Sequence, residues 1–170
     1  MVNHVRRLNA VDAAELHAVF DAHMPWLCRR ITLMVGDPEE ASDLAQEVFV
    51  RAAERWPIGS PDVTARWCAT VGMNLAIDEL RRRRRWGFLR LRETDAEWAM
   101  SVDPDLWTAI SALEPASRAA LILTVLDGYT QDEVASALGV ARGTVASWLS
   151  RARDRMRPAI GRDDDERQIR

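Results

Sequence analysis

The chain has 170 residues, of which 48% are hydrophobic and 29% are charged, and its net charge is −3. This composition indicates a globular protein, and the length suits one ordinary domain or two small ones. No apolar run approaches the ~18 residues that a membrane-spanning helix requires, so we expect no membrane association. Residues 1–7 lack the apolar core of a secretory signal, and a cytoplasmic protein is expected.

Charge is distributed unevenly along the chain. All 23 basic residues are Arg. Seven of them fall within residues 81–92, which hold no acid, whereas residues 93–105 hold five acids and no base. A protein that binds DNA unaided is usually basic overall, but this chain is basic only in patches. The pattern indicates that another component supplies most of any DNA affinity.

Cysteine and histidine spacing gives no sign of a metal centre or a catalytic site. Cys28 and Cys68 lie in apolar helical stretches without Cys-x-x-Cys spacing, which favours buried free thiols. His17 and His23 are six residues apart, which is not one helical turn. No phosphate-binding glycine loop or nucleophile motif is present. We therefore expect no enzyme activity and no cofactor.

The first half of the chain predicts three helices. A capping box at Asp12 begins a helix over residues 12–35, which Pro25 is expected to kink. A second helix follows from Asp37 to about residue 56. Residues 57–62 form a Pro-, Gly- and Ser-rich loop, and a third helix spans roughly residues 63–85.

The second half predicts four shorter helices after a break in periodicity. Asp103-Pro104 and Glu114-Pro115 each begin a helix, a capping box begins another at Thr130, and the last runs over residues 142–156. The acidic tail after Pro158 is expected to fray.

This pattern predicts an all-α chain with two helical domains joined by a flexible linker. The domains cover residues 1–85 and 104–160, the acidic linker covers residues 86–103, and the tail covers residues 161–170. An extended linker of this length could span up to ~60 Å.

Residues 130–157 predict a helix-turn-helix, because a short helix, a tight turn and a longer helix follow one another. Val145, Leu149, Ala152 and Met156 share the inner face of the last helix. The outer face can bond bases and phosphates, and its candidates are Arg142, Thr144, Ser147, Trp148, Arg151 and Arg155. An ordinary helical hairpin with a solvated face, or one that binds protein through Trp148, is the alternative.

The third predicted helix carries a polar face that also suits nucleic acid. Asn can donate to and accept from a base edge, and an Arg ladder can follow phosphates. A solvated basic helix end is the alternative for the Arg run, and core packing is the favoured alternative for the Trp. The candidates are Trp67, Asn74, Asp78, Arg81, Arg82 and Arg85.

Acidic and amide side chains occupy the polar side of the second predicted helix. They are Asp43, Gln46, Glu47 and Glu54. A solvated face is the usual explanation for such a set. Because negative charge here cannot contact DNA, any functional role lies in docking a basic protein surface.

Several segments resemble signatures of bacterial sigma factors of the sigma-70 family. Residues 43–49 (DLAQEVF) resemble the D-L-x-Q-E-x-F signature of region 2, and residues 74–82 (NLAIDELRR) resemble the stretch that ends it. The segments that resemble region 4 are Leu113-Glu114-Pro115, Asp127-Gly128-Tyr129-Thr130, Glu133-Val134-Ala135, Leu138-Gly139-Val140 and Gly143-Thr144-Val145. With no room for further sigma regions, the chain resembles the minimal two-domain, extracytoplasmic-function (ECF) type.

The resemblance implies a factor that binds core RNA polymerase and directs it to promoters. Asp43, Gln46 and Glu47 would bind the clamp helices of the β′ subunit. The third helix and the loop at residues 57–64 would open and capture the −10 element as single strands, with Asn74 near a flipped base. The C-terminal domain would dock on the β flap and bind the duplex −35 element. An anti-sigma factor is common for such proteins and would be a further partner.

The chain departs from the family pattern at three positions. The family often has Ser where Ala141 stands, so the recognition helix is expected to lose about 1 kcal/mol of capping. A basic residue is common at the position of Ala146, and Arg at that of Trp148. The −35 sequence bound by this chain is therefore expected to differ from the family's usual one.

Two other classes of protein remain as alternatives. A stand-alone helix-turn-helix repressor or activator explains the C-terminal residues but leaves the region 2 signature and the linker unexplained. An enzyme would need a metal or nucleophile that the spacing of histidines and cysteines does not supply.

Overall fold

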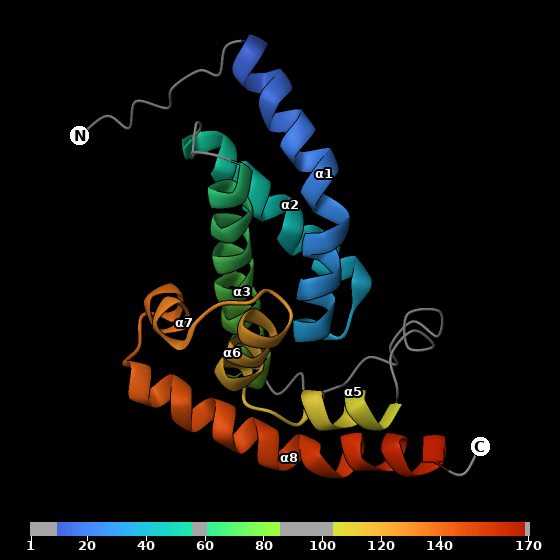
Figure 1. The fold of residues 1–170 in the computed structure, drawn as a ribbon. Helices are drawn as coiled ribbons and strands as arrows, with labels where there is room; N and C mark the ends of the chain where they lie inside the picture. Colours follow the sequence, from blue (N-terminus) through green and yellow to red (C-terminus); the bar gives the residue numbers. More distant parts are fainter. Residues whose placement is uncertain (1–9, 56–60, 86–103, 169–170) are drawn as a thin grey trace.

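The computed structural model describes residues 10–55, 61–85 and 104–168, and these contain seven α-helices and no strand (Figure 1). The prediction of an all-α chain is confirmed. The linker at residues 86–103 and most of the predicted loop at residues 57–62 lie outside the described residues. The helices are α1 (Ala10–Val35), α2 (Pro38–Arg55), α3 (Pro61–Arg85), α5 (Pro104–Ser111), α6 (Pro115–Val125), α7 (Gln131–Leu138) and α8 (Arg142–Gln168).

Three predicted boundaries are wrong. Helix α1 begins at Ala10, so Asp12, which was predicted to cap its start, lies inside the helix. Helix α3 begins at Pro61 rather than at residue 63, because proline suits the first helical turn, where its missing N–H has no intrahelical partner in any case. Helix α8 continues to Gln168 instead of ending near Met156, so the acidic tail is helical. Pro158 removes one helical hydrogen bond but does not end the helix, and Pro25 likewise lies inside α1.

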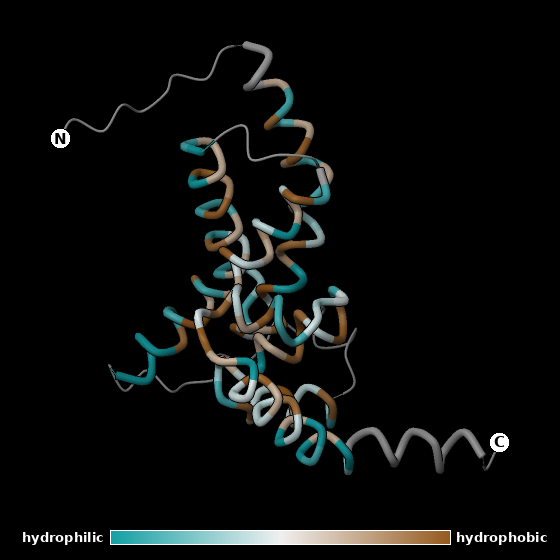
Figure 2. Tube along the Cα trace, turned by 60° about the vertical axis from the view of Figure 1, so that its left-hand side comes forward, coloured by the Kyte–Doolittle hydropathy of each residue, from teal (hydrophilic) through white to brown (hydrophobic). Residues whose placement is uncertain are grey.

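Helices α1, α2 and α3 pack into a bundle with a common apolar core. Leu27, Ile31 and Met34 of α1 are fully buried there. Gly72 of α3 lets α1 come close, because a Cβ at this position would lie 3.1 Å from Leu27 Cδ1. Figure 2 shows hydrophobic and hydrophilic residues alternating along these helices, as helices with one buried face require. The other buried side chains are Thr32 and Val35 of α1, Ala41, Ala45, Val48, Phe49 and Ala52 of α2, and Thr64, Cys68, Ala69, Met73, Ala76 and Ile77 of α3.

Helices α6, α7 and α8 pack together, and α5 packs on α8. Their buried apolar residues belong to the same core as those of α1, α2 and α3. The capping box at the start of α7 is present: the Glu133 N–H donates to Thr130 Oγ1 at 3.3 Å, and the Thr130 N–H donates to Glu133 Oε2 at 2.8 Å. Gly139 ends α7 with a φ of 64°, a left-handed conformation that favours glycine. The predicted helix-turn-helix is confirmed at residues 131–138 and 142–156.

The two groups of helices contact each other directly. Helix α3 packs on α6 and α7, and α1 packs on α6 (Figure 1). The buried Arg118 of α6 bridges the groups, because its guanidinium donates to the carbonyl oxygens of Met34, Ser111 and Leu113. The candidate DNA-binding residues of both groups therefore lie on helices that pack against one another.

The capping box gives a first prediction. Replacing Thr130 by Ala removes the acceptor for the Glu133 N–H and is expected to lower the free energy of unfolding by about 1 kcal/mol. Thr130→Ser keeps the hydroxyl and serves as the matched control. Urea denaturation followed by circular dichroism measures both, and equal stability of T130A and T130S contradicts the prediction.

Candidate nucleic-acid and polymerase interfaces

Helix α8 has one buried face and one exposed basic face, as predicted. Val145, Leu149 and Ala152 are buried, and Met156 packs against the core from a half-buried position. Arg142, Ser147, Arg151 and Arg155 are exposed and Thr144 is half-buried. The exposed face follows the capped turn of a helix-turn-helix, which is the arrangement that places a helix in the major groove.

Local contacts hold three of the α8 candidates in place. The Ser147 hydroxyl donates to the Gly143 carbonyl at 2.9 Å, and Arg151 Nε donates to the Ser147 carbonyl at 3.2 Å. Arg142 Nε lies 3.3 Å from Asp132 Oδ1 of α7. These side chains remain at the surface, so DNA phosphates or bases can replace their present partners.

Trp148 corrects the prediction that it projects outward with no core to fill. Its side chain is half-buried and packs against the hydrophobic core. Trp148 lies only about 40° around the helix from the buried Ala152 and about 80° from the half-buried Met156, so a large ring covers the edge of the core. Part of the ring remains exposed for contact with a partner.

Asn74 of α3 is half-buried and already engaged within the chain. Its side-chain amide donates to the Thr70 carbonyl at 3.0 Å and to the Ala137 carbonyl, at the end of α7, at 3.1 Å. Sequence reasoning placed Asn74 on a solvent-facing ladder with the arginines. The structure instead places it against the second group of helices.

The five arginines at residues 81–85 have different partners. Arg81 lies 3.7 Å from Asp78 Oδ1, and Arg82 Nε donates to Glu79 Oε2 at 2.8 Å; these arginines and Asp78 are exposed. Arg83 is half-buried and pairs with Glu40 and Glu79, and Arg84 pairs at 2.8 Å with Glu114, the residue before α6. Arg85 is exposed. The Arg83–Glu40 and Arg84–Glu114 pairs join segments far apart in sequence, and the composition of the Arg run gave no signal of them.

Trp67 packs against the core from a half-buried position near the start of α3. The Arg55 guanidinium lies 6.0 Å from its ring centroid, within the range of a cation–π contact. This placement favours the core-packing role that sequence reasoning preferred, with one edge left at the surface.

The acidic candidates of α2 form an exposed face. Asp43, Gln46, Glu47 and Glu54 are all exposed, and Glu47 Oε1 accepts from Arg51 Nε at 2.9 Å. The opposite side of α2 is buried in the bundle. This surface is open to a basic partner without any rearrangement of the helix.

Both cysteines are free, as predicted, but only Cys68 is fully buried, whereas Cys28 is half-buried. Burial raises the pKa of the Cys28 thiol and raises that of Cys68 to about 11, so neither is a reactive thiolate at neutral pH. Within residues 10–55, 61–85 and 104–168 no group of His, Cys, Asp and Glu side chains is arranged to hold a metal ion. No helix among them is long and apolar enough to span a membrane.

Sequence reasoning missed an open cleft of about 460 Å³ between α1, α3 and the α6–α7 turn. Tyr129 at its wall donates its hydroxyl to the Arg66 carbonyl at 2.9 Å, and the Arg66 guanidinium lies 4.5 Å from the Tyr129 ring centroid. Burial raises the pKa of Asp127, also at the wall, although Arg30 donates to it. The lining residues are Trp26, Asp62, Ala65, Arg66, Ala69, Leu126, Asp127 and Tyr129.

Comparisons with known proteins agree with this architecture. The family model "Sigma-70 region 2" matches residues 19–86, and "Sigma-70, region 4" matches residues 104–156. The chain is 30% identical over 157 residues to the ECF RNA polymerase sigma factor SigL of Mycobacterium tuberculosis, covering 82% of this chain and 85% of SigL. It is 31% identical over 144 residues to the ECF sigma factor SigE of Mycolicibacterium smegmatis, covering 77% of this chain and 56% of SigE.

Two solved structures share the fold. The sigma factor RpoE of Bartonella quintana, in complex with the anti-sigma factor NepR, superposes with a TM-score of 0.61 at 23% identity over 88% of this chain and 96% of that one. CnrH, in complex with the cytosolic domain of CnrY, superposes with a TM-score of 0.60 at 21% identity over 89% of this chain and 90% of that one.

Two helical units carrying regions 2 and 4 define the chain as a sigma-70-type transcription initiation factor. It belongs to the ECF RNA polymerase sigma factors.

The position of Trp148 gives a second prediction. Trp148→Ala is expected to lower the free energy of unfolding by about 1–2 kcal/mol, because half of a large ring leaves the core. Arg151→Ala, on the exposed face, is expected to change it by less than about 0.5 kcal/mol. Urea titrations of both variants decide between packing and a purely external role, and a neutral W148A contradicts the packing role.

Proposed function

We propose that this sigma factor directs core RNA polymerase to promoters by binding a duplex −35 element with α8 and a single-stranded −10 element with α3. The observation that carries the proposal is the division of α8 into a buried apolar face and an exposed basic face after a capped helix-turn. This division gives a rigid helix whose free face has the charge and donors that groove binding requires. Its contacts would be Arg142, Thr144, Ser147, Trp148, Arg151 and Arg155.

The proposed −10 surface lies on α3. Asn74 offers an amide that can bond a base edge, and Trp67 has an edge on which a base can stack. Arg81, Arg82 and Arg85 are exposed and can approach phosphates, whereas Asp78 would orient Arg81 through its ion pair. In this assignment Asn74 contacts a base edge, Trp67 stacks on a base, and the three exposed arginines contact phosphates.

The proposed polymerase-binding surface is the acidic face of α2. Asp43, Gln46 and Glu47 are exposed and their charge repels DNA, so they suit a basic protein surface such as the β′ clamp helices. Polymerase would then supply most of the affinity for DNA, which accounts for the net charge of −3. We place the protein in the cytoplasm with the polymerase.

An anti-sigma factor is the proposed regulatory partner. RpoE of Bartonella quintana was solved in complex with the anti-sigma factor NepR, and CnrH with the cytosolic domain of CnrY. The present chain shares their fold, which supports a partner of the same class.

The function gives a third prediction, tested by run-off transcription with core polymerase on fragments of the host genome. Core polymerase with this protein is expected to give promoter-specific transcripts.

Asn74→Ala is expected to lower open-complex formation by preassembled holoenzyme about 10-fold, since a lost base contact is worth ~1–3 kcal/mol. Asp43→Arg/Glu47→Arg is expected to abolish binding to core polymerase, while Glu39→Gln serves as a control on the same helix. The absence of any transcript from core polymerase with this protein would contradict the proposed sigma function.

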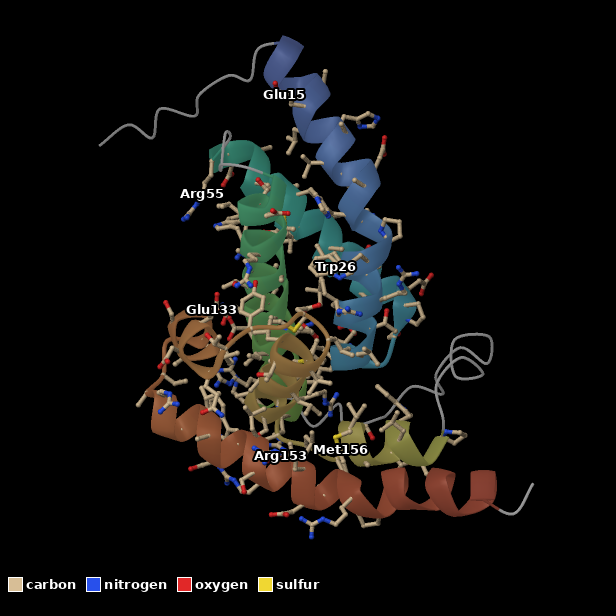
Figure 3. The ribbon with its side chains drawn as sticks, in the orientation of Figure 1. Glu15, Trp26, Arg55, Glu133, Arg153 and Met156 are labelled. Atoms are coloured by element: carbon tan, nitrogen blue, oxygen red, sulfur yellow. The ribbon has the colours of Figure 1, made fainter. Side chains whose placement is uncertain are left out.

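A fourth prediction concerns salt. Arg151→Ala and Arg155→Ala are each expected to reduce the slope of log affinity against log salt by about 1, because each removes one phosphate contact. Arg153→Ala is the matched control: Arg153, labelled on α8 in Figure 3, is exposed, and two residues of helix turn it about 160° away from Arg151. Fluorescence anisotropy of holoenzyme on a promoter duplex measures the slopes, and equal slopes for R151A and R153A contradict the assignment.

A further inference from the structure

The corner where α2 ends and α3 begins carries apolar surface that the core does not use. Val63 of α3 is 52% exposed. Trp67 lies four residues further along, so the two side chains share one side of α3, and Trp67 is only half-buried. A single exposed valine is ordinary on a protein surface, but here it lies beside an aromatic side chain that also reaches the surface.

Arg55, the last residue of α2, adds a positive charge to this corner. Its guanidinium carbon lies over the Trp67 ring, 6.0 Å from the ring centroid, and the residue is exposed at the end of α2 (Figure 3). Among the described residues Arg55 forms no ion pair, whereas Arg81 and Arg82 each lie beside a carboxylate. The corner therefore combines an aromatic ring, an exposed aliphatic side chain and a cation that no described carboxylate neutralises.

The corner lies on the same side of α3 as the other residues proposed for the −10 element. Helical geometry places Val63, Asn74 and Arg85 within about 40° of Trp67 around the helix axis. Trp67 and Asn74 are about 10 Å apart along that axis. Successive nucleotides of a stacked strand are roughly 3.4 Å apart, so Asn74 and the corner suit different nucleotides of one strand.

We propose that Arg55, Val63 and Trp67 form a platform that binds one unpaired nucleotide of the −10 element, and that Arg55 is a further DNA contact of this protein. The inference rests on the proposed function. Unpaired bases stack on aromatic rings and on guanidinium planes, and the corner offers both together with an aliphatic side chain. The charge of Arg55 also attracts the phosphate of the bound nucleotide.

The chemistry of the platform favours open DNA without reading its sequence. Every base has a flat face, so stacking accepts any base, in contrast to the hydrogen bonds that the Asn74 amide can make to a base edge. A base that is paired within a duplex has its faces covered by its neighbours and cannot use the platform. Arg55 and Val63 are therefore expected to raise affinity for the single-stranded −10 element and to leave affinity for the duplex −35 element unchanged.

Two single variants test the platform in assembled holoenzyme. Arg55→Ala and Val63→Ser change exposed positions, so both are expected to fold, which circular dichroism checks. Arg29→Ala removes the same charge from an exposed position of α1 that has no proposed role and serves as the control. The probe is a single-stranded oligonucleotide carrying the −10 element of a promoter found by run-off transcription. Fluorescence anisotropy is expected to show about 5- to 10-fold weaker binding for R55A and V63S and no change for R29A.

Abasic sites placed one at a time along the oligonucleotide identify the nucleotide that is bound. At one position the missing base is expected to cost wild type several-fold in affinity but to cost R55A/V63S only about 2-fold, because the platform is already impaired. Asn74→Ala is expected to lose its sensitivity at a different position. Unchanged sensitivity of R55A/V63S at every position, or loss at the same position as N74A, overturns the platform.

Salt dependence separates the phosphate contact from simple covering of Trp67. On the single strand, R55A is expected to reduce the slope of log affinity against log salt by about 0.7, and Arg55→Lys, which keeps the charge, is expected to restore it. If R55A lowers stability but matches R29A in every DNA measurement, Arg55 only covers the ring and the inference is wrong. If wild-type holoenzyme gives no transcript from any template, the proposed function fails and this inference falls with it.

Discussion

Arg118 is the interaction on which the rest of the structure depends. Its guanidinium is buried, and burial lowers its pKa to about 10, so it stays charged at neutral pH. Its hydrogen bonds go to the carbonyls of Met34, Ser111 and Leu113, which lie at helix ends where intrahelical partners are missing. One cation thus serves the end of α1 and the α5–α6 turn together, and it sets how the two groups of helices meet.

A second constraint is that each functional helix must also be part of a core. Helix α8 buries Val145, Leu149 and Ala152 in the core, and the basic face that we propose for DNA stays exposed. Helix α3 buries Cys68 and Met73, and α6 and α7 pack on part of its remaining surface. Asn74 shows the result, because its side-chain amide donates both to the Thr70 carbonyl of its own helix and to the Ala137 carbonyl of α7.

The sequence was sufficient to predict the helices and the capping box, because those depend on short-range chemistry. Thr130 and Glu133 are three residues apart, and their mutual hydrogen bonds need no information from elsewhere in the chain. The pairing of Arg84 with Glu114 was not predictable in this way, since nothing local distinguishes Arg84 from its four neighbours. The orientation of Trp148 was predicted wrongly for a different reason. Its angle around the helix places it at the edge of the core, where a large ring can turn inward.

Glu133 connects local folding with the contact between the two groups of helices. One carboxylate oxygen accepts from the Thr130 N–H and hydroxyl, and the other accepts from Arg66. The Thr130 backbone N–H is the largest cause that lowers the pKa of Glu133, and the Arg66 contributions are smaller. The cap therefore holds the Glu133 carboxylate ionised and in place, where it accepts from Arg66. One side chain thus fixes both the first turn of α7 and the contact of α7 with α3, so local and long-range structure depend on the same carboxylate.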